Sequence, residues 1–331
     1  MNVIRALAAA GAALMVTGLT GSFEGTAAAS HAATAAASAS ASRLAAAPGS
    51  QLWVSRYYAG EARSVAVSPD GTRVYVTGTG YRLYDRTPYT TVAYDAASGM
   101  ILWVRSYGRG TGGEAAEARA VAVSPDGTKV FVTGSNPAFD YPVVVTVAYD
   151  ASTGALLWVA KYSGPYVGGA VAAGMAVTED GTRLVVAGTA YEKGYGGGDT
   201  YYAAVAYDTR SGSRAGATLY NGSVHGAAHA SAVAVRPGGR TVFVTGASGA
   251  DYATVAYGAA KGTRLWTARY NGPANGGDAP SSIAVNPAGS RVFVTGYSWG
   301  KASKSDYATV AYSAATGARL WATRYNGPGS G

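Results

Sequence analysis

The chain has 331 residues, a formal net charge of +8, 47 glycines and no cysteine. The lack of cysteine excludes disulfides, thiolate metal sites and cysteine nucleophiles. Its cations are spread along the chain rather than gathered in a block, so the basic charge does not indicate a nucleic-acid ligand.

The first 50 residues differ in composition from the rest of the chain. Arg5 precedes an uncharged stretch of Ala, Gly, Leu and Val over residues 6–19, and Ala27-Ala28-Ala29 forms an A-x-A-like cleavage site. This order predicts a secretory signal peptide over residues 1–29, because the apolar run is shorter than the ~20 residues that a membrane span needs. Residues 30–50 are almost entirely Ala and Ser and are expected to form a disordered linker. We therefore expect a secreted, extracellular or cell-wall-associated protein with one folded domain over residues 51–331 and no transmembrane segment after signal removal.

The folded domain is built from a repeated pattern. Its first copy predicts four strands, over residues 64–68, 73–78, 89–94 and 100–107. They are separated by a Pro-Asp-Gly turn, a loop of variable length and an Asp-to-Gly turn. The glycine at the end of the second strand recurs every 50 to 58 residues, at Gly78, Gly134, Gly188, Gly246 and Gly296. Four short antiparallel strands in units of this length predict an all-β fold, a β-propeller of about five four-stranded blades.

One further strand is predicted before the first copy. Residues 52–58 match the fourth strand of the pattern, which brings the total to twenty-one strands, one more than five blades need. This strand either competes with residues 320–325 for the outer position of the last blade, or belongs to an open ring. An open ring would leave uncovered surface and favour self-association.

A tryptophan motif marks the end of most copies. The sequence Ala-Tyr-Asp-x-x-Ser/Thr-Gly-x-x-x-Trp occurs at residues 93–103 and 148–158, with weaker copies at 206–216, 256–266 and 311–321. The tryptophans at the fourth-strand position are predicted to wedge between blades as packing residues, and they are Trp53, Trp103, Trp158, Trp266 and Trp321. Gly216 stands at this position in the third copy, so a weaker contact is expected there.

These segments resemble the tryptophan-docking motif of quinoprotein alcohol dehydrogenase-like (PQQ-like) propellers. The units are also similar to bacterial SBBP repeats, in residues 251–257 and 269–273, and their Val-Ala-Val-Ser-Pro-Asp-Gly segments resemble YVTN-type surface propellers. The resemblance implies a propeller fold. Quinoprotein enzymes usually carry a vicinal cysteine pair and a calcium site with a catalytic aspartate, and none of these residues can be placed on this sequence. The resemblance therefore does not carry the enzyme activity with it.

The sequence predicts no catalytic residue, no metal site and no cofactor. His225 and His229 are the only histidines of the repeats, and they are expected in an inter-blade loop with no third ligand nearby. Aspartates such as Asp70 and Asp95 lie in turns, where they are expected to accept local backbone hydrogen bonds.

The connections sort into two sets. Antiparallel connectivity places the short, nearly constant turns at one face of the propeller and the variable loops at the other. Variable loops on a rigid scaffold commonly carry binding, and these loops are rich in aromatic and cationic side chains. The candidate ligand-binding residues are Tyr81, Arg82, Tyr84, Phe139, Tyr191, Tyr195, Tyr297, Trp299 and Lys301.

The sequence favours an exported, non-enzymatic propeller scaffold that binds a protein or a polysaccharide, at the cell surface or outside the cell, through its variable loops. Two alternatives stay open. One is a quinone- or metal-dependent propeller enzyme, either an oxidoreductase or lactonase-like. The other is a truncated propeller without an independent function.

Overall fold

The regular structure of the described residues consists entirely of β-strands. The computed structural model describes residues 50–57, 60–80, 88–108, 116–136, 141–166, 168–193, 197–222, 227–301 and 305–327, together with two N-terminal strands. This part of the chain has no helix that is long and apolar enough to cross a membrane. The fold class is therefore all-β, as the sequence pattern predicted.

Twenty of the strands form five antiparallel sheets of four, and each sheet contains consecutive strands. Blade 1 contains β4 (Glu61–Val67), β5 (Arg73–Thr79), β6 (Tyr89–Asp95) and β7 (Ile101–Tyr107); blade 2 contains β8 (Glu117–Val123), β9 (Lys129–Asn136), β10 (Val143–Asp150) and β11 (Leu156–Tyr162). Blade 3 contains β12 (Ala170–Val177), β13 (Arg183–Lys193), β14 (Gly197–Asp208) and β15 (Arg214–Tyr220). Blade 4 contains β16 (Ala228–Val235), β17 (Thr241–Ser248), β18 (Asp251–Gly258) and β19 (Arg264–Tyr270); blade 5 contains β20 (Asp278–Val285), β21 (Arg291–Trp299), β22 (Ser305–Ser313) and β23 (Arg319–Tyr325).

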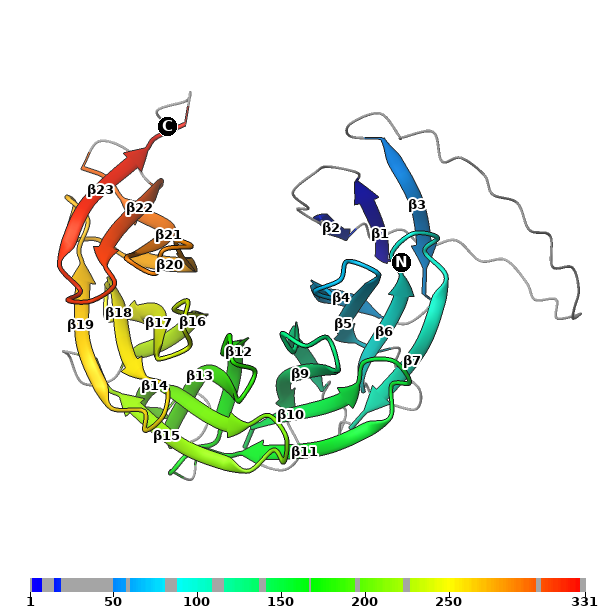
Figure 1. Cartoon of the computed structure of the whole chain (residues 1–331). Helices are drawn as coiled ribbons and strands as arrows, with labels where there is room; N and C mark the ends of the chain where they lie inside the picture. Colours follow the sequence, from blue (N-terminus) through cyan, green and yellow to red (C-terminus); the bar gives the residue numbers. More distant parts are fainter. Residues whose placement is uncertain are drawn as a thin grey trace, which may run out of the picture.

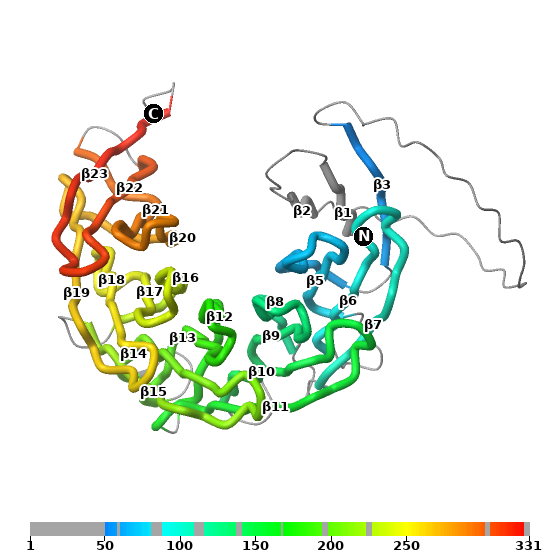
Figure 2. Tube along the Cα trace, viewed as in Figure 1, coloured from blue at the N-terminus to red at the C-terminus, as the bar shows by residue number. Residues whose placement is uncertain are grey.

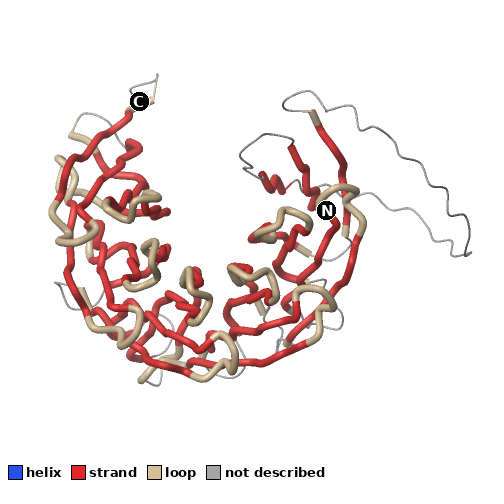
Figure 3. The backbone as a smooth tube through the Cα atoms, in the orientation of Figure 1, coloured by secondary structure: helices blue, strands red, loops and turns tan. Residues whose placement is uncertain are grey.

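The five blades follow one another around an open arc. The first strand of each blade lies on the inner side of the arc and the fourth on its outer rim (Figure 1). The chain trace passes in order from blade 1 to blade 5, whose free side lies across a wide opening from the N-terminal strands (Figure 2). No strand pairing among the described residues joins blade 5 to the start of the arc. The propeller is thus an open ring of five blades (Figure 3).

One more strand, β3 (Gln51–Arg56), precedes blade 1. Its indole at Trp53 packs on the same face of blade 1 as the fourth strand of a preceding blade would. β3 pairs with β1 (Asn2–Leu7), which pairs with β2 (Met15–Gly18). The linker predicted over residues 30–50 lies outside the described residues except for its last residue, and the signal peptide remains a prediction.

The two short turns of each blade are bonded to each other. In blade 1 the carboxylate of Asp70 accepts hydrogen bonds from the Ser68 hydroxyl and from the backbone and hydroxyl of Thr72, which lower its pKa to about 2. The N–H of Ala96 in the second turn donates to the carbonyl of Thr72 at 2.9 Å. The equivalent bonds in blades 2 to 5 run from Ala151 to Thr128, from Thr209 to Thr182, from Ala259 to Arg240 and from Ala314 to Ser290. This repeated bond confirms that the constant turns share one face.

The recurrent glycine of the second strand is required by a close approach of two backbones. In every blade the pairing of the first and second strands shifts register beside this glycine, as between Ala62 and Ser64 in blade 1. A Cβ at Gly78 would fall on the carbonyl oxygen of Glu61, and the other four glycines have the same environment. The spacing seen in the sequence is therefore the spacing of a bulge in each first strand.

Tryptophan side chains join the blades. Trp103 of β7 donates its indole N–H to the carbonyl of Ala151 in blade 2 at 3.1 Å, and its ring covers Gly154. Gly154 has a φ of +69°, and a Cβ there would lie 2.8 Å from the ring, so glycine is needed. The same contact is made by Trp53 to Ala96 at 2.9 Å, by Trp158 to Thr209 at 3.0 Å and by Trp266 to Ala314 at 3.1 Å.

The junction between blades 3 and 4 lacks this indole. Gly216 stands at its position in β15, and no indole among the described residues reaches Ala259 or Gly262 of blade 4. The hydroxyl of Thr218 instead donates to the carbonyl of Gly262 at 2.7 Å. A small apolar pocket lined by Gly216, Tyr257 and Gly262 remains beside it. The missing indole thus leaves this junction less completely packed than its neighbours.

Replacing Trp158 by Ala should lower the free energy of unfolding by about 3–5 kcal/mol, because the indole is only 9 % exposed and its removal leaves a cavity. Trp321→Ala is the matched control, since Trp321 is 41 % exposed. It should change the free energy of unfolding by less than about 0.5 kcal/mol. Urea denaturation followed by circular dichroism measures both. Equal losses would contradict the assigned blade order.

Gly216→Trp should raise the free energy of unfolding by about 1 kcal/mol, because the new indole could bond to the Ala259 carbonyl and fill the small pocket. Space is available, since the nearest atom to a Cβ at this position is 3.8 Å away. Gly216→Ala, which adds no ring, controls for the loss of backbone freedom. A Trp variant no more stable than the Ala variant would show that Thr218 already fills the site.

Candidate ligand-binding face

The longer connections lie at the opposite end of the blades from the bonded short turns. We call this surface the variable-loop face, and its described segments include residues 141–142, 163–166, 168–169, 221–222, 249–250, 271–277 and 300–301. Backbone bonds cross it from blade to blade: the N–H of Ala170 donates to Pro142 at 2.8 Å, and that of Asp278 to Ala250 at 2.7 Å. Neighbouring loops therefore hold one another in place.

The structure describes four of the nine ligand-binding residues predicted from the sequence. Trp299 and Lys301 are exposed at the variable-loop face beside blade 5. Tyr191 and Tyr297 are described within strands. The other five lie outside the described residues, and they are Tyr81, Arg82, Tyr84, Phe139 and Tyr195.

Tyr191 and Tyr297 were expected in loops, but the hairpins that contain them are longer than the sequence pattern indicated. β13 continues past Tyr191, which pairs with Thr200, and the Tyr191 side chain is 8 % exposed. β21 continues past Tyr297, which pairs with Tyr307 of β22. Tyr297 is exposed, as is its partner Tyr307 on the same face of the sheet. Tyr191 and Tyr297 are therefore held in strands by pairing, and they do not belong to the loops that follow.

Trp299 is the last residue of β21, and a buried carboxylate fixes its position. Its backbone N–H donates to Asp278 at 3.1 Å, and the same carboxylate accepts the N–H of Gly272 at 2.6 Å. Asp278 is only 2 % exposed. Trp299 packs on Gly276, where a Cβ would lie 2.9 Å from the Cβ of Trp299. One carboxylate therefore ties the loop before β20 to the end of β21, and it leaves the indole 43 % exposed.

An arginine of β23 holds the same corner from the other side. Arg324 donates to the Asp306 carboxylate from Nε at 3.1 Å and from Nη2 at 2.6 Å, and to the carbonyl of Ser298 at 2.8 Å. Desolvation opposes the charge on Arg324, but the bonds to Asp306 and Tyr270 outweigh it, so its pKa is raised. The guanidinium thereby fixes the residue next to Trp299.

Blade 4 carries a copy of this network. Arg269 donates to Asp251 at 2.8 Å and to the carbonyl of Ser248 at 2.8 Å. In both blades the Asp and the Arg are 18 residues apart. Blades 1 to 3 have Ser106, Lys161 and Leu219 at the arginine position, as the register of their fourth strands shows. The sequence analysis did not use this spacing, although its repetition in the last two copies is a visible signal of a structural pair.

The histidines and carboxylates of the described residues do not form a metal centre. His229 was expected in an inter-blade loop, but β16 begins at Ala228 and pairs His229 with Ala247. Burial lowers the pKa of His229, and His225 lies outside the described residues. Among the described residues, no group of three or more His, Cys, Asp or Glu side chains is placed to hold a metal ion.

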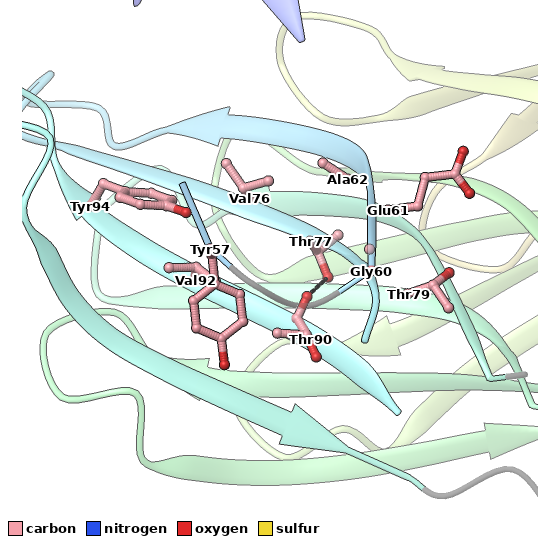
Figure 4. A pocket seen from close by; sticks show the side chains of 11 residues that line it. Tyr57, Gly60, Glu61, Ala62, Val76, Thr77, Thr79, Thr90, Val92 and Tyr94 are labelled. Carbon is pink, nitrogen blue, oxygen red and sulfur yellow. Dashed lines mark hydrogen bonds between the residues drawn. The ribbon is translucent and has the colours of Figure 1, made fainter. Parts of the chain in front are cut away.

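A groove on blade 1 is a second feature with a binding shape. We call it the blade 1 groove; it lies beside β3, and its lining includes Tyr57, Ala62, Val76, Val92 and Tyr94. Figure 4 shows Tyr57 alongside Val92, with the hydroxyl of Thr77 donating to the carbonyl of Thr90 in the floor. In blades 2 to 5 the equivalent face is covered by the preceding blade.

Residues 89–215 match a family model described as "Outer membrane protein assembly factor BamB". No curated protein sequence matches the chain. Among solved structures, the chain is similar to a europium-containing methanol dehydrogenase, with a TM-score of 0.55 and 14 % identity over 84 % of this chain and 66 % of that one. Hydrazine synthase of Kuenenia stuttgartiensis has a TM-score of 0.52 and 15 % identity over 78 % of this chain and 64 % of that one. A quinohemoprotein alcohol dehydrogenase from Pseudomonas putida HK5 has a TM-score of 0.50 and 18 % identity over 81 % of this chain and 43 % of that one.

The repeated blades, the indole contacts between them and these matches all indicate the same fold. The chain is a β-propeller, and its repeats are similar to those of PQQ-like propellers. It spans less than two thirds of the length of each of these three structures. At these identities the likeness concerns the fold, and the activities named for those enzymes are not carried over.

The residues of this propeller do not fit the ion named for the methanol dehydrogenase. A hard cation takes several oxygen ligands that converge on one point. The described carboxylates are instead dispersed: Asp70 lies in a short turn, Asp278 binds two backbone N–H groups, and Asp306 pairs with Arg324. These three carboxylates therefore do not converge on one point as ligands of such a cation would.

Asp306→Ala should lower the free energy of unfolding by about 3 kcal/mol, because it leaves the half-buried Arg324 without its carboxylate. Asp251→Ala, the matched change in blade 4, should cost less, since Asp251 and Arg269 are both more exposed than Asp306 and Arg324. Denaturant titration of both variants at neutral pH measures the difference. A larger loss in Asp251→Ala would contradict this assignment.

Proposed function

We propose that this protein is an exported, non-enzymatic propeller scaffold that binds a protein or a polysaccharide through its variable-loop face, at the cell surface or outside the cell. The observation that carries the proposal is the indole of Trp299, which is exposed at this face while its backbone is held rigidly by Asp278. Large aromatic side chains of this kind often provide most of the energy of a binding surface.

The surroundings of Trp299 suit a binding role. Asp278 and Arg324 both bind the peptide unit between Ser298 and Trp299, so little backbone entropy is lost when a ligand binds the ring. Lys301 lies two residues further along the chain, is exposed, and adds a cation to this face. A ligand with a flat apolar face and polar or anionic edges, such as a sugar ring or a peptide side chain, fits this combination.

The carboxylates near this face support a non-enzymatic role. Asp278 accepts two backbone N–H groups, and Asp251 and Asp306 are paired with arginines. Carboxylates in such hydrogen bonds and ion pairs hold the backbone and the arginine side chains in place. Export is supported by the charge and apolar pattern of the first 29 residues.

Trp299→Ala should weaken ligand binding by about tenfold or more, since truncation of a central aromatic residue commonly costs about 2 kcal/mol. Isothermal titration against soluble cell-wall polysaccharides and against purified secreted proteins measures the affinity and identifies the ligand class. Trp321→Ala is the control, because its indole is similarly exposed but lies on the outer rim of blade 5. Absence of binding to either class, or equal binding by both variants, would refute the proposal.

A further inference from the structure

The side of blade 5 that faces the opening consists of residues that are buried in the other blades. On β22 and β23, Tyr307 is 70 % exposed and Tyr325 is 61 % exposed. The strand register shows that their equivalents in blade 4 are Tyr252 and Tyr270, which are 0 % and 5 % exposed. The exposed row continues to Tyr297, which pairs with Tyr307.

Within the chain this face is always covered in the same way. Blade 5 itself covers blade 4: Val292, Val294 and Val310 pack on the face that contains Tyr252 and Tyr270. The contact is completed by Trp266, which donates to the carbonyl of Ala314. The uncovered face of blade 5 therefore has the chemistry of an inter-blade contact, and the occupant that it fits is the opposite face of another blade of this repeat.

The chain carries that opposite face, incompletely covered, at its other end. Blade 1 presents Val76, Val92 and Tyr94 on the side away from blade 2. β3 lies on its outer part, with Trp53 bonded to Ala96, and β2 contacts its inner strand β4, while the blade 1 groove remains beside β3 (Figure 4). The two ends of the arc are thus the two halves of one inter-blade contact.

The strand that holds blade 1 and the last strand of blade 5 have the same sequence pattern. Residues 52–57 read Leu-Trp-Val-Ser-Arg-Tyr, and residues 320–325 read Leu-Trp-Ala-Thr-Arg-Tyr. Both place an indole, a small hydroxyl residue and a tyrosine on one side of a strand, since side chains alternate with a period of two. Residues 320–325 therefore carry every group with which residues 52–57 contact blade 1.

We propose that copies of this chain associate head to tail, with blade 5 of one copy covering blade 1 of the next. Residues 320–325 then replace residues 52–57, and Trp321 donates to the carbonyl of Ala96 of the second copy in place of Trp53. The exchange conserves the indole contact, releases β3 together with its pairing to β1, and adds the burial of Tyr307 and Tyr325. The opening between the two ends of one arc keeps the two halves apart within a single copy (Figure 1).

Light scattering coupled to size-exclusion chromatography of the full-length chain over a concentration series tests this proposal. The mass should rise beyond two chains, because a heterologous contact leaves a free half at each end. Trp321→Ala should remain at the mass of one chain at every concentration, with the melting temperature of the wild type at concentrations where the wild type is a single chain. Trp53→Ala should associate at a concentration at least about tenfold lower than the wild type, because the competing indole is gone.

A mixing experiment shows which ends meet, even if Trp53→Ala folds poorly. In Trp321→Ala only blade 1 can still take part in the contact. In Gly99→Leu only blade 5 can, since a Cβ at Gly99 would lie 2.6 Å from the docked indole ring. The mixture should form a one-to-one complex and no larger species. Undiminished association of Trp321→Ala would overturn the proposal. So would a wild-type dimer that Trp53→Ala leaves unchanged, because that would indicate pairing of two blade 5 faces.

Discussion

The structure depends on one contact, in which the indole of one blade reaches the short turn of the next. Trp103 spans from β7 to the carbonyl of Ala151, and the ring needs the bare backbone of Gly154 beneath it. The contact ties the outer strand of one blade to the turn of its neighbour, so it sets both the order of the blades and their spacing. Each use of it requires two units, one that donates the indole and one that accepts it. An open arc therefore has an unused donor at one end and an acceptor filled by a single strand at the other.

Because the indole contacts lie at the short turns, the loops at the opposite end of the blades are free to differ in sequence. The short turns keep their glycines because they receive the side chains of the preceding blade and bond to each other, and in blades 1 to 3 a carboxylate also holds the first turn. The variable loops do not receive these indoles, and they are held by bonds that differ between blades. At blade 5 these bonds centre on Asp278 and Arg324, which fix the backbone around Trp299 without covering its ring. Rigidity at one face thus makes an exposed aromatic surface possible at the other.

The strands were predictable because their signals are local. The Pro-Asp-Gly turn over residues 69–71 and the start of β5 at Arg73 follow from side-chain bonds that span a few residues. The loops were less predictable. Tyr191 and Tyr297 belong to strands because cross-strand pairing with Thr200 and Tyr307, across the loop, extends both hairpins. Asp278 was overlooked because its role requires Gly272 and Trp299 to meet at one point, which no local pattern encodes.

The sequence by itself determined the unit: four strands, two constant turns and an indole that must be received by a glycine. These features are decided by residues that are neighbours in the chain or in one sheet. Only the tertiary structure decided which units are covered. Trp158 and Trp321 occupy the same position of the same motif, yet one is buried and the other is exposed. The difference arises because burial depends on whether a further blade packs on that face, and the residues of a blade do not encode the presence of its neighbour.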